Sequence, residues 1–275
     1  MIRLAVRVGR AHAADALAEL LVFSPAGVEE VDVDAEHVEY VLYGAPGELP
    51  ALPALQATVG GALVGIRTTE IDDDWPMRWR HFHHPVGIDG ALFVRAPWHD
   101  PPPAGGPIDI VIEPAQAFGT GAHATTRGCL ELLVVLAREG AATGSLLDLG
   151  SGSGVLAIAA AKLGFGPIAA VDHEREAVAA SAANAAANGV TLDAAPLDLL
   201  GDPLPVAETI TANLLAPLLR TLVTRLQTPP RRLIASGLLR EQAGEIADAF
   251  ERRHGLRERA RREHGDWSAL LLERA

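Results

Sequence analysis

Cysteine and aromatic residues are scarce in this sequence of 275 residues. The single cysteine, Cys129, excludes an internal disulfide and a zinc site built from cysteines, and makes a reducing cytoplasm the expected compartment. Aromatic residues account for 4% of the chain, whereas hydrophobic residues reach 49%. This composition indicates a globular protein with a largely aliphatic core, which excludes disorder as its main state.

Basic residues and long apolar runs are also in short supply. Lys and Arg total 23 against 35 for Asp and Glu, a net charge of −12. Since such a surface cannot neutralise many phosphates, we expect no direct binding to nucleic acid. Arg3 and Arg7 interrupt the apolar N-terminal residues, and no later stretch is long enough to span a bilayer. We expect a cytoplasmic monomer with neither signal peptide nor membrane anchor.

The first quarter of the chain predicts a small α+β domain. Ile2, Leu4, Val6 and Val8 recur with the period of a strand that has one buried face. The elements expected next are a helix at 11–23, strands at 28–34 and 38–43, a helix at 51–59 and a strand at 63–68. This β-α-β-β-α-β order is typical of a ferredoxin-like domain, which we assign to residues 1–68.

A linker with a short helix is expected over residues 69–85, and a second domain over 86–275. Strand-like runs near 92–94 and 108–112 open the second domain. Helices are then expected at 125–138, 155–164, 174–188, 214–227 and 240–250, and strands at 145–149, 168–172, 190–194, 208–212 and 231–235, with a closing strand pair near 256–273. Such alternation specifies an α/β domain of the Rossmann-like kind, with a mostly parallel sheet.

A glycine-rich turn marks a cofactor site in the second domain. An apolar strand ends in Asp148-Leu149-Gly150-Ser151-Gly152-Ser153-Gly154 and is followed at once by a helix. Glycines there let the backbone approach a ligand at the carboxyl edge of the sheet. Asp172 ends the next strand, where a carboxylate accepts hydrogen bonds from ribose hydroxyls.

The acidic residue inside the motif favours S-adenosylmethionine over a nicotinamide cofactor. Asp148 would repel a pyrophosphate but suits the cationic methionine end of S-adenosylmethionine. Gly150, Gly152 and Gly154 form a tight GxGxG turn, which differs from the spacing that aims a helix at phosphate. Because Gly152, Gly154 and Ala157 also satisfy a relaxed dinucleotide pattern, a nicotinamide-dependent oxidoreductase stays open as an alternative.

Two further segments are expected at the same edge. One is the loop from Ala117 to Thr126, which supplies Phe118, Thr120, His123 and Thr126. The other places Asn213 at the end of a strand. In each case the plain alternative is helix capping, by Thr125 or Thr126 in the first segment and by Asn213 in the second.

Together these motifs resemble the PrmA family. They are Phe118-Gly119-Thr120-Gly121 with His123 and Thr125-Thr126, the glycine turn after Asp148, Asp172, Asn213-Leu214-Leu215 and Ser236-Gly237-Leu238-Leu239. That family methylates protein eleven of the large ribosomal subunit with S-adenosylmethionine. The resemblance covers about 72–275 well and the N-terminal domain by pattern only. It implies an N-terminal domain that grips the substrate protein, a linker and a seven-stranded methyltransferase domain.

The resemblance also implies roles for individual residues. It puts the cofactor against Thr126, Gly150, Asp172 and Asn213. We complete the predicted cofactor-binding set with Phe118, Thr120, Asp148, Gly152 and Gly154. Asn213 is the predicted catalytic residue, since its carbonyl oxygen can accept a hydrogen bond from an incoming amine, either a lysine side chain or an N-terminal amine.

Several alternatives stay open from the residues alone. The acceptor could be another protein lysine or a small amine, and the chain could be a binding module without activity. His123 could relay a proton, although a loop-ordering hydrogen bond is the plainer interpretation. No metal site is expected at His81, His83 and His84, which lack carboxylates at ligand spacing. The acidic stretch Asp32, Asp34, Glu36 and Glu39 could face a basic protein or be a solvated surface.

Overall fold

The chain forms two compact units, Met1–Phe82 and His83–Ala275. In this computed structural model, the described residues are 2–20, 28–44, 63–70, 84–113 and 121–274.

The first unit is a four-stranded antiparallel sheet with a helix between its first two strands. Its elements are β1 (Ile2–Gly9), the 3-10 turn η1 (Arg10–His12), α1 (Ala13–Leu20), β2 (Glu29–Asp32), β3 (His37–Gly44) and β4 (Leu63–Glu70). The strand order is β2-β3-β1-β4. Leu4, Val6 and Val8 are buried as their alternation predicted. The helix expected at 51–59 lies outside the described residues.

The second unit contains a mixed seven-stranded sheet. Its strands are β8 (Leu146–Leu149), β9 (Ile168–Asp172), β10 (Asp193–Pro196), β11 (Thr209–Asn213), β12 (Arg232–Leu239), β13 (Leu256–His264) and β14 (Trp267–Arg274). They lie in the order β10-β9-β8-β11-β12-β14-β13. The first five are parallel, and β14 is antiparallel to both of its neighbours, β12 and β13. The expected mixed α/β fold with a closing antiparallel pair is confirmed.

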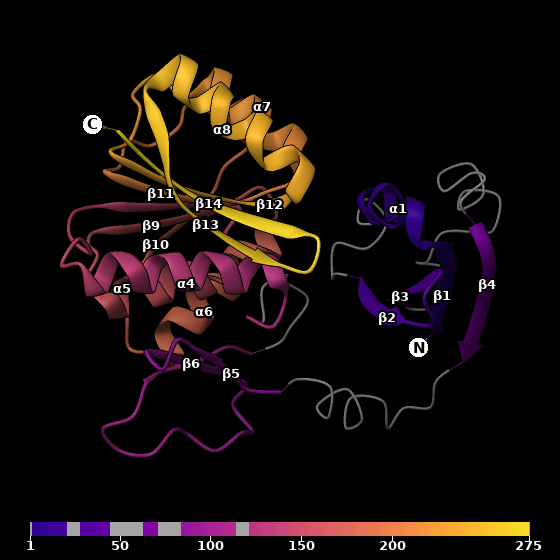
Figure 1. Ribbon diagram of the computed structural model, residues 1–275. Helices are drawn as coiled ribbons and strands as arrows, with labels where there is room; N and C mark the ends of the chain where they lie inside the picture. The colour runs from indigo at the N-terminus through magenta and orange to yellow at the C-terminus, as the bar shows by residue number, and fades with distance from the viewer. Residues whose placement is uncertain (1, 21–27, 45–62, 71–83, 114–120, 275) are drawn as a thin grey trace. The chain divides into compact units, whose positions relative to one another are not determined.

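Helices cover both faces of this sheet (Figure 1). One face carries α4 (Ala124–Arg138), α5 (Val155–Leu163) and α6 (Arg175–Ala187), and the other carries α7 (Ala216–Arg225) and α8 (Arg240–His254). Successive strand residues belong to opposite faces, so Leu146 joins one hydrophobic cluster and Leu147 the other. Every residue of β8 is therefore buried, as in a sheet that helices enclose.

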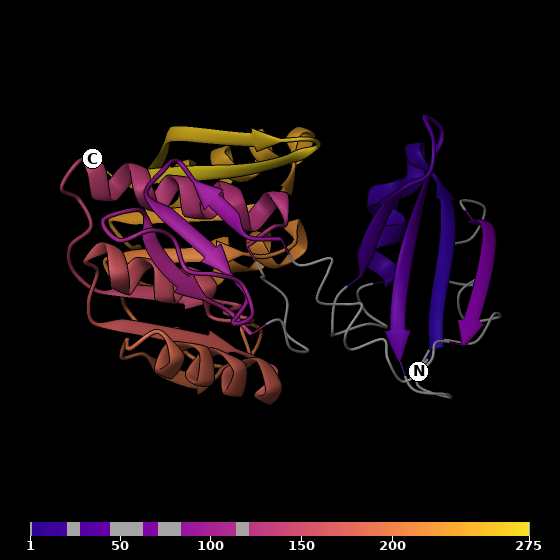
Figure 2. The same ribbon diagram turned by 90° about the horizontal axis from the view of Figure 1, so that it is seen from below.

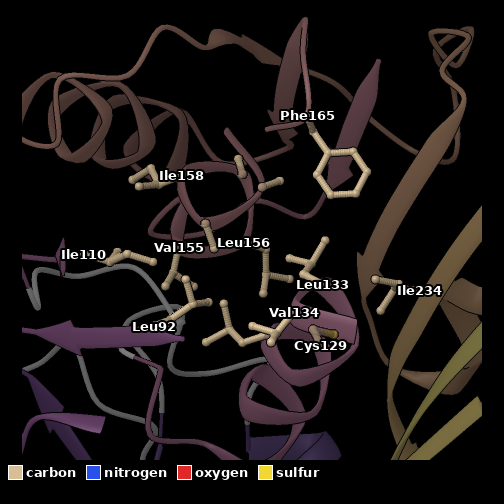
Figure 3. Packing of buried hydrophobic residues seen from close by; sticks show 14 of the residues in the cluster. Leu92, Ile110, Cys129, Leu133, Val134, Val155, Leu156, Ile158, Phe165 and Ile234 are labelled. Carbon is tan, nitrogen blue, oxygen red and sulfur yellow. The ribbon is translucent and has the colours of Figure 1, made fainter. Parts of the chain in front are cut away.

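A three-stranded sheet outside α4 and α5 adds a further layer (Figure 2). It consists of β5 (Val86–Ile88), β6 (Leu92–Arg95) and β7 (Ile108–Val111). Leu92 and Ile110 point into the same cluster as Leu133 of α4 and Val155 of α5 (Figure 3). The sequence did not predict β5 because three residues are too few to show an alternating pattern.

Helix boundaries differ from the prediction where capping decides them. The helix expected at 214–227 begins at Ala216, since Leu215 occupies the N-cap and a proline lies in the first turn. The helix expected at 240–250 continues to His254 and ends at Gly255, whose φ of 69° forms a left-handed C-cap.

No helix within the described ranges is long and apolar enough to cross a membrane.

Candidate functional site

The centre of the large sheet is a topological switch point. β8 and β11 are parallel neighbours, yet α5 follows β8 on one face and α7 follows β11 on the other. Ligands of open α/β sheets bind outside the carboxyl ends of the strands at such a point. Gly150 directly follows β8 and Asn213 ends β11, so two of the predicted site residues lie at this edge.

The glycine turn needs glycine for two reasons. Gly150, Gly152 and Gly154 have φ values of 74°, 53° and 81°, a left-handed conformation that other residues rarely adopt. A Cβ atom on Gly150 would also lie 2.6 Å from Cδ2 of Leu214, and one on Gly154 would lie 3.0 Å from Ser181. The turn is therefore closely enclosed by the chain around it, and side chains at these positions would force it open.

Asp172 holds the glycine turn from the end of β9. Its Oδ2 accepts a hydrogen bond from the backbone N–H of Gly152 at 2.9 Å, and its Oδ1 accepts one from Glu174 at 3.1 Å. Each carboxylate oxygen can accept more than one hydrogen bond. Asp172 can therefore brace the turn and still accept hydrogen bonds from a ligand's hydroxyls.

Asp148 belongs to β8, and its buried side chain contacts the neighbouring strand β11. Its Oδ1 accepts a hydrogen bond of 2.6 Å from the hydroxyl of Thr211. Within the described part of the chain Oδ2 makes no hydrogen bond of ordinary geometry. Burial raises the pKa of Asp148 to about 7, and the charge of Asp172 adds to this, whereas Thr211 and the backbone amide of Ala157 lower it. An acid in this state can change its charge near neutral pH.

Thr126 and Asn213, the other described residues of the predicted cofactor-binding set, contact each other at this edge of the sheet. Nδ2 of Asn213 donates a hydrogen bond to Oγ1 of Thr126 at 3.3 Å. Asn213 is the last residue of β11, and the N-cap of α7 is Leu215. The alternative that Asn213 caps the following helix is therefore wrong. Its side chain joins the end of β11 to the first turn of α4.

His123 caps the start of α4. It is the N-cap of that helix, and its Nδ1 lies 2.8 Å from Oγ1 of Thr125 and accepts from the Thr125 amide. The helix is thus capped by His123 and not by Thr125 or Thr126. The ring of Trp267 packs edge-on at a centroid distance of 5.4 Å. Burial lowers the pKa of His123, which favours the neutral ring that an N-cap acceptor requires.

The remaining predictions concern the loop residues before α4 and the absence of a metal site. Phe118, Thr120, His81 and His83 lie outside the described residues. Among those that are described, no group of three or more metal-ligating side chains is found.

The acidic stretch near the N-terminus is engaged within its own unit. Glu39 pairs with Arg7 at 2.9 Å, and Asp34 contacts His37 and accepts from the Glu36 amide. These contacts favour an internally paired surface over a docking site.

Sequence reasoning missed a set of polar residues on α6. Ser181, Asn184 and Asn188 hydrogen-bond to the glycine turn or to β7. The alanine-rich helix suggested only strong helix propensity. The available signal was the spacing of three polar residues at i, i+3 and i+7, which places them on one face.

Comparison with known proteins decides the family. The family model described as "Ribosomal protein L11 methyltransferase (PrmA)" matches residues 53–275. The chain belongs to the PrmA family. The resemblance seen in the motifs is thereby confirmed, and membership of this family of methyltransferases excludes the oxidoreductase alternative.

Individual PrmA relatives cover most of the chain. A ribosomal protein L11 methyltransferase of Pelotomaculum thermopropionicum is 36% identical over 228 residues, 81% of this chain and 72% of that protein. One of Pelobacter propionicus is 33% identical over 90% of this chain and 79% of its own length. The crystal structure of a ribosomal protein L11 methylase from Lactobacillus delbrueckii subsp. bulgaricus matches with a TM-score of 0.60 and 31% identity, over 70% of this chain and 99% of that one.

Proposed function

We propose that this PrmA-family protein transfers methyl groups from S-adenosylmethionine to amino groups of ribosomal protein L11. The names of its relatives support this substrate. The single observation that carries the assignment is the pairing of Asn213 with Thr126 at the switch point, beside the strand that leads into the glycine turn.

The described residues fit S-adenosylmethionine. Gly150 and Gly154 have no room for side chains, and Gly152 shares their left-handed conformation, so backbone would face the cofactor there. Asp172 would hold its ribose hydroxyls. Asp148 keeps a buried oxygen, Oδ2, without a hydrogen-bond partner among the described residues, which suits the cationic methionine end. Thr126 and Asn213 complete the set of described residues that would bind the cofactor. Phe118 and Thr120 are proposed as further cofactor-binding residues from the sequence motif alone.

S-adenosylmethionine supplies a methyl group that is activated by its bond to a positively charged sulfur. The acceptor nitrogen must attack with a free lone pair, whereas a free lysine has a pKa of about 10.4. That proton must leave before or during the attack; the neutral amide of Asn213 cannot take it, but it can orient the free amine. Because its Nδ2 donates to Thr126, its carbonyl oxygen remains to accept a hydrogen bond from the incoming amine and to aim the lone pair. Alignment and fixed dipoles of this kind supply most of the rate in such a displacement.

We assign residues 1–68 to substrate recognition, 69–85 to a linker and 86–275 to methyl transfer. The strand order β2-β3-β1-β4, with α1 between β1 and β2, supports a ferredoxin-like fold for the first part. In this proposal the protein is a cytoplasmic monomer that binds the ribosomal protein directly and binds neither nucleic acid nor membrane.

Mass spectrometry after methyl transfer tests the proposal. The full chain is incubated with purified ribosomal protein L11 and S-adenosylmethionine whose methyl group is isotopically labelled. Labelled methyl groups on lysine or N-terminal amines of the substrate are expected. Heat-denatured enzyme is the control for chemical methylation. Label on another added basic protein but none on L11 would contradict the substrate, and no label on any protein would contradict the activity.

A further inference from the structure

One face of α6 is a row of polar side chains within a helix that is otherwise rich in alanine. Ser181 and Asn184 lie on α6 and Asn188 is its C-cap, and the three follow one another at helical spacing. Ser181 and Asn184 are buried, with exposed fractions of 0% and 4%. Buried polar groups destabilise a fold unless they are hydrogen-bonded, so the partners of this row indicate what it is for.

The N-terminal part of the row holds the glycine turn. The hydroxyl of Ser181 donates to the carbonyl oxygen of Gly152 at 3.0 Å, and Nδ2 of Asn184 donates to the carbonyl oxygen of Ser153 at 2.9 Å. Two successive carbonyl groups of the turn are thus tied to α6.

The C-terminal part of the row holds the end of β7. Oδ1 of Asn184 accepts a hydrogen bond from the backbone N–H of Glu113 at 3.0 Å. The amide of Asn188 pairs with both backbone groups of Val111, at 2.9 and 2.6 Å. Among the three residues, Asn184 alone contacts both segments, because its amide N–H donates to the turn and its amide oxygen accepts from Glu113, just after the strand.

We propose that Asn184 is a positioning residue for the cofactor, since its one amide group locks the glycine turn to Glu113, two residues after β7. This inference rests on the proposed function. Three left-handed glycines give the turn large conformational freedom. A ligand that orders such a turn must offset the lost entropy, and a turn that is already held binds more tightly.

Calorimetric titration of the full chain with S-adenosylhomocysteine tests the role. Asn184→Ala removes both hydrogen bonds and should raise the Kd about 10-fold, chiefly through loss of the one that holds the turn. Asn188→Ala is the matched control, because it removes an amide from the same helix face that contacts β7 but not the glycine turn; its Kd should stay within about 2-fold. In steady-state assays Asn184→Ala should raise the KM for S-adenosylmethionine and leave the KM for the ribosomal protein unchanged.

A second variant covers the case in which Asn184→Ala does not fold. Asn184→Asp keeps the oxygen that accepts from Glu113 and removes the donor to Ser153, so it should raise the Kd by a similar factor. An equal Kd for the wild type and both Asn184 variants would overturn the inference, as would an equal rise in Asn188→Ala. A wild-type chain that does not bind S-adenosylhomocysteine would instead overturn the proposed function.

Discussion

At the scale of single residues, the contact between Asn213 and Thr126 predicts a separation of catalysis from binding. Asn213→Ala should lower kcat about 100-fold, as expected when a preorganised dipole at the reacting atoms is lost. The Kd for S-adenosylhomocysteine should rise much less, by up to about 3-fold, since Asn213 is one of several cofactor contacts and the glycine turn and Asp172 remain. Single-turnover transfer and calorimetry measure the two quantities.

Thr126→Val provides the companion measurement. It removes the hydroxyl oxygen that accepts from Asn213 and should give a smaller loss of about 10-fold in kcat, because the amide is present but less fixed. Near-normal turnover of Asn213→Ala with intact cofactor affinity would show that Asn213 does not orient the acceptor amine.

Asp148 predicts a pH dependence of stability. Its pKa is about 7 in the folded chain and about 3.9 when unfolded. Between these values the folded chain holds a proton that the unfolded chain has lost, so the free energy of unfolding should fall as pH rises from about 4 to about 7. The slope contributed by this group is at most about 1.4 kcal/mol per pH unit.

Urea unfolding of the wild type and Asp148→Asn at several pH values isolates this slope. The variant cannot ionise at that position and should lose the decline, whereas Asn substituted for the exposed Asp193 should keep it. A wild type and an Asp148→Asn variant with the same pH profile would exclude Asp148 as the source.

The residue types of the site were predictable from the sequence because each follows a strand or opens a helix in a recognisable motif. Asp172 and the glycines lie where strand-to-helix turns must place them. The contacts of Asn213 were not predictable. Asn213 would cap α7 if that helix began at residue 214, and it does not because the helix begins at 216. That boundary is set by the proline in the first turn and by Leu215, and two residues are below what a hydrophobic pattern resolves.

At the scale of elements, two glycines within helices should respond oppositely to alanine. In α4 a Cβ on Gly128 would lie 2.7 Å from Cβ of Ala269 on β14, whereas nothing lies within 4 Å of the corresponding position on Gly244 in α8. Gly128→Ala should destabilise by about 1–3 kcal/mol through overpacking. Gly244→Ala should stabilise by about 0.5–1 kcal/mol through helix propensity.

Thermal and urea unfolding measure both changes. The two substitutions add the same methyl group in the same secondary structure, so each controls for the other. A loss of stability in both variants would mean that helix propensity does not govern α8, and a gain in both would mean that α4 can move away from β14.

The sequence predicts these elements best where their patterns are long. The alternation of strands and helices from α4 to β14 extends over many periods, and the structure follows it closely. β5 has three residues and no such pattern, and the polar face of α6 was hidden by its alanines. Which side of a helix meets which segment depends on packing between distant parts of the chain, which local periodicity does not encode.

At the scale of the whole molecule, we expect the second unit to bind the cofactor and the first unit to recognise the substrate protein. His83–Ala275 contains both large hydrophobic clusters and every described candidate site residue. A chain limited to these residues should bind S-adenosylhomocysteine with a Kd within about 3-fold of the full chain. Its kcat/KM for ribosomal protein L11 should fall at least about 100-fold, the effect of losing a few strong interface contacts.

Circular dichroism and the Tm of the shortened chain are the control for folding. Unchanged methylation of L11 by a folded chain of 83–275 would show that the N-terminal unit does not recognise the substrate. Loss of cofactor binding from such a chain would show that the site depends on residues before 83.

The two outer strands of the seven-stranded sheet have a consequence for aggregation. Strands at a sheet edge can pair with other molecules unless they are short, interrupted by proline or charged. β10 has four residues and ends in Pro196, which has no N–H to donate. At the opposite edge β13 carries Arg257, Glu258, Arg259, Arg261, Arg262 and Glu263. The folded seven-stranded sheet is therefore a poor template for intermolecular sheets, and any fibrils that contain its strands should grow from unfolded chains.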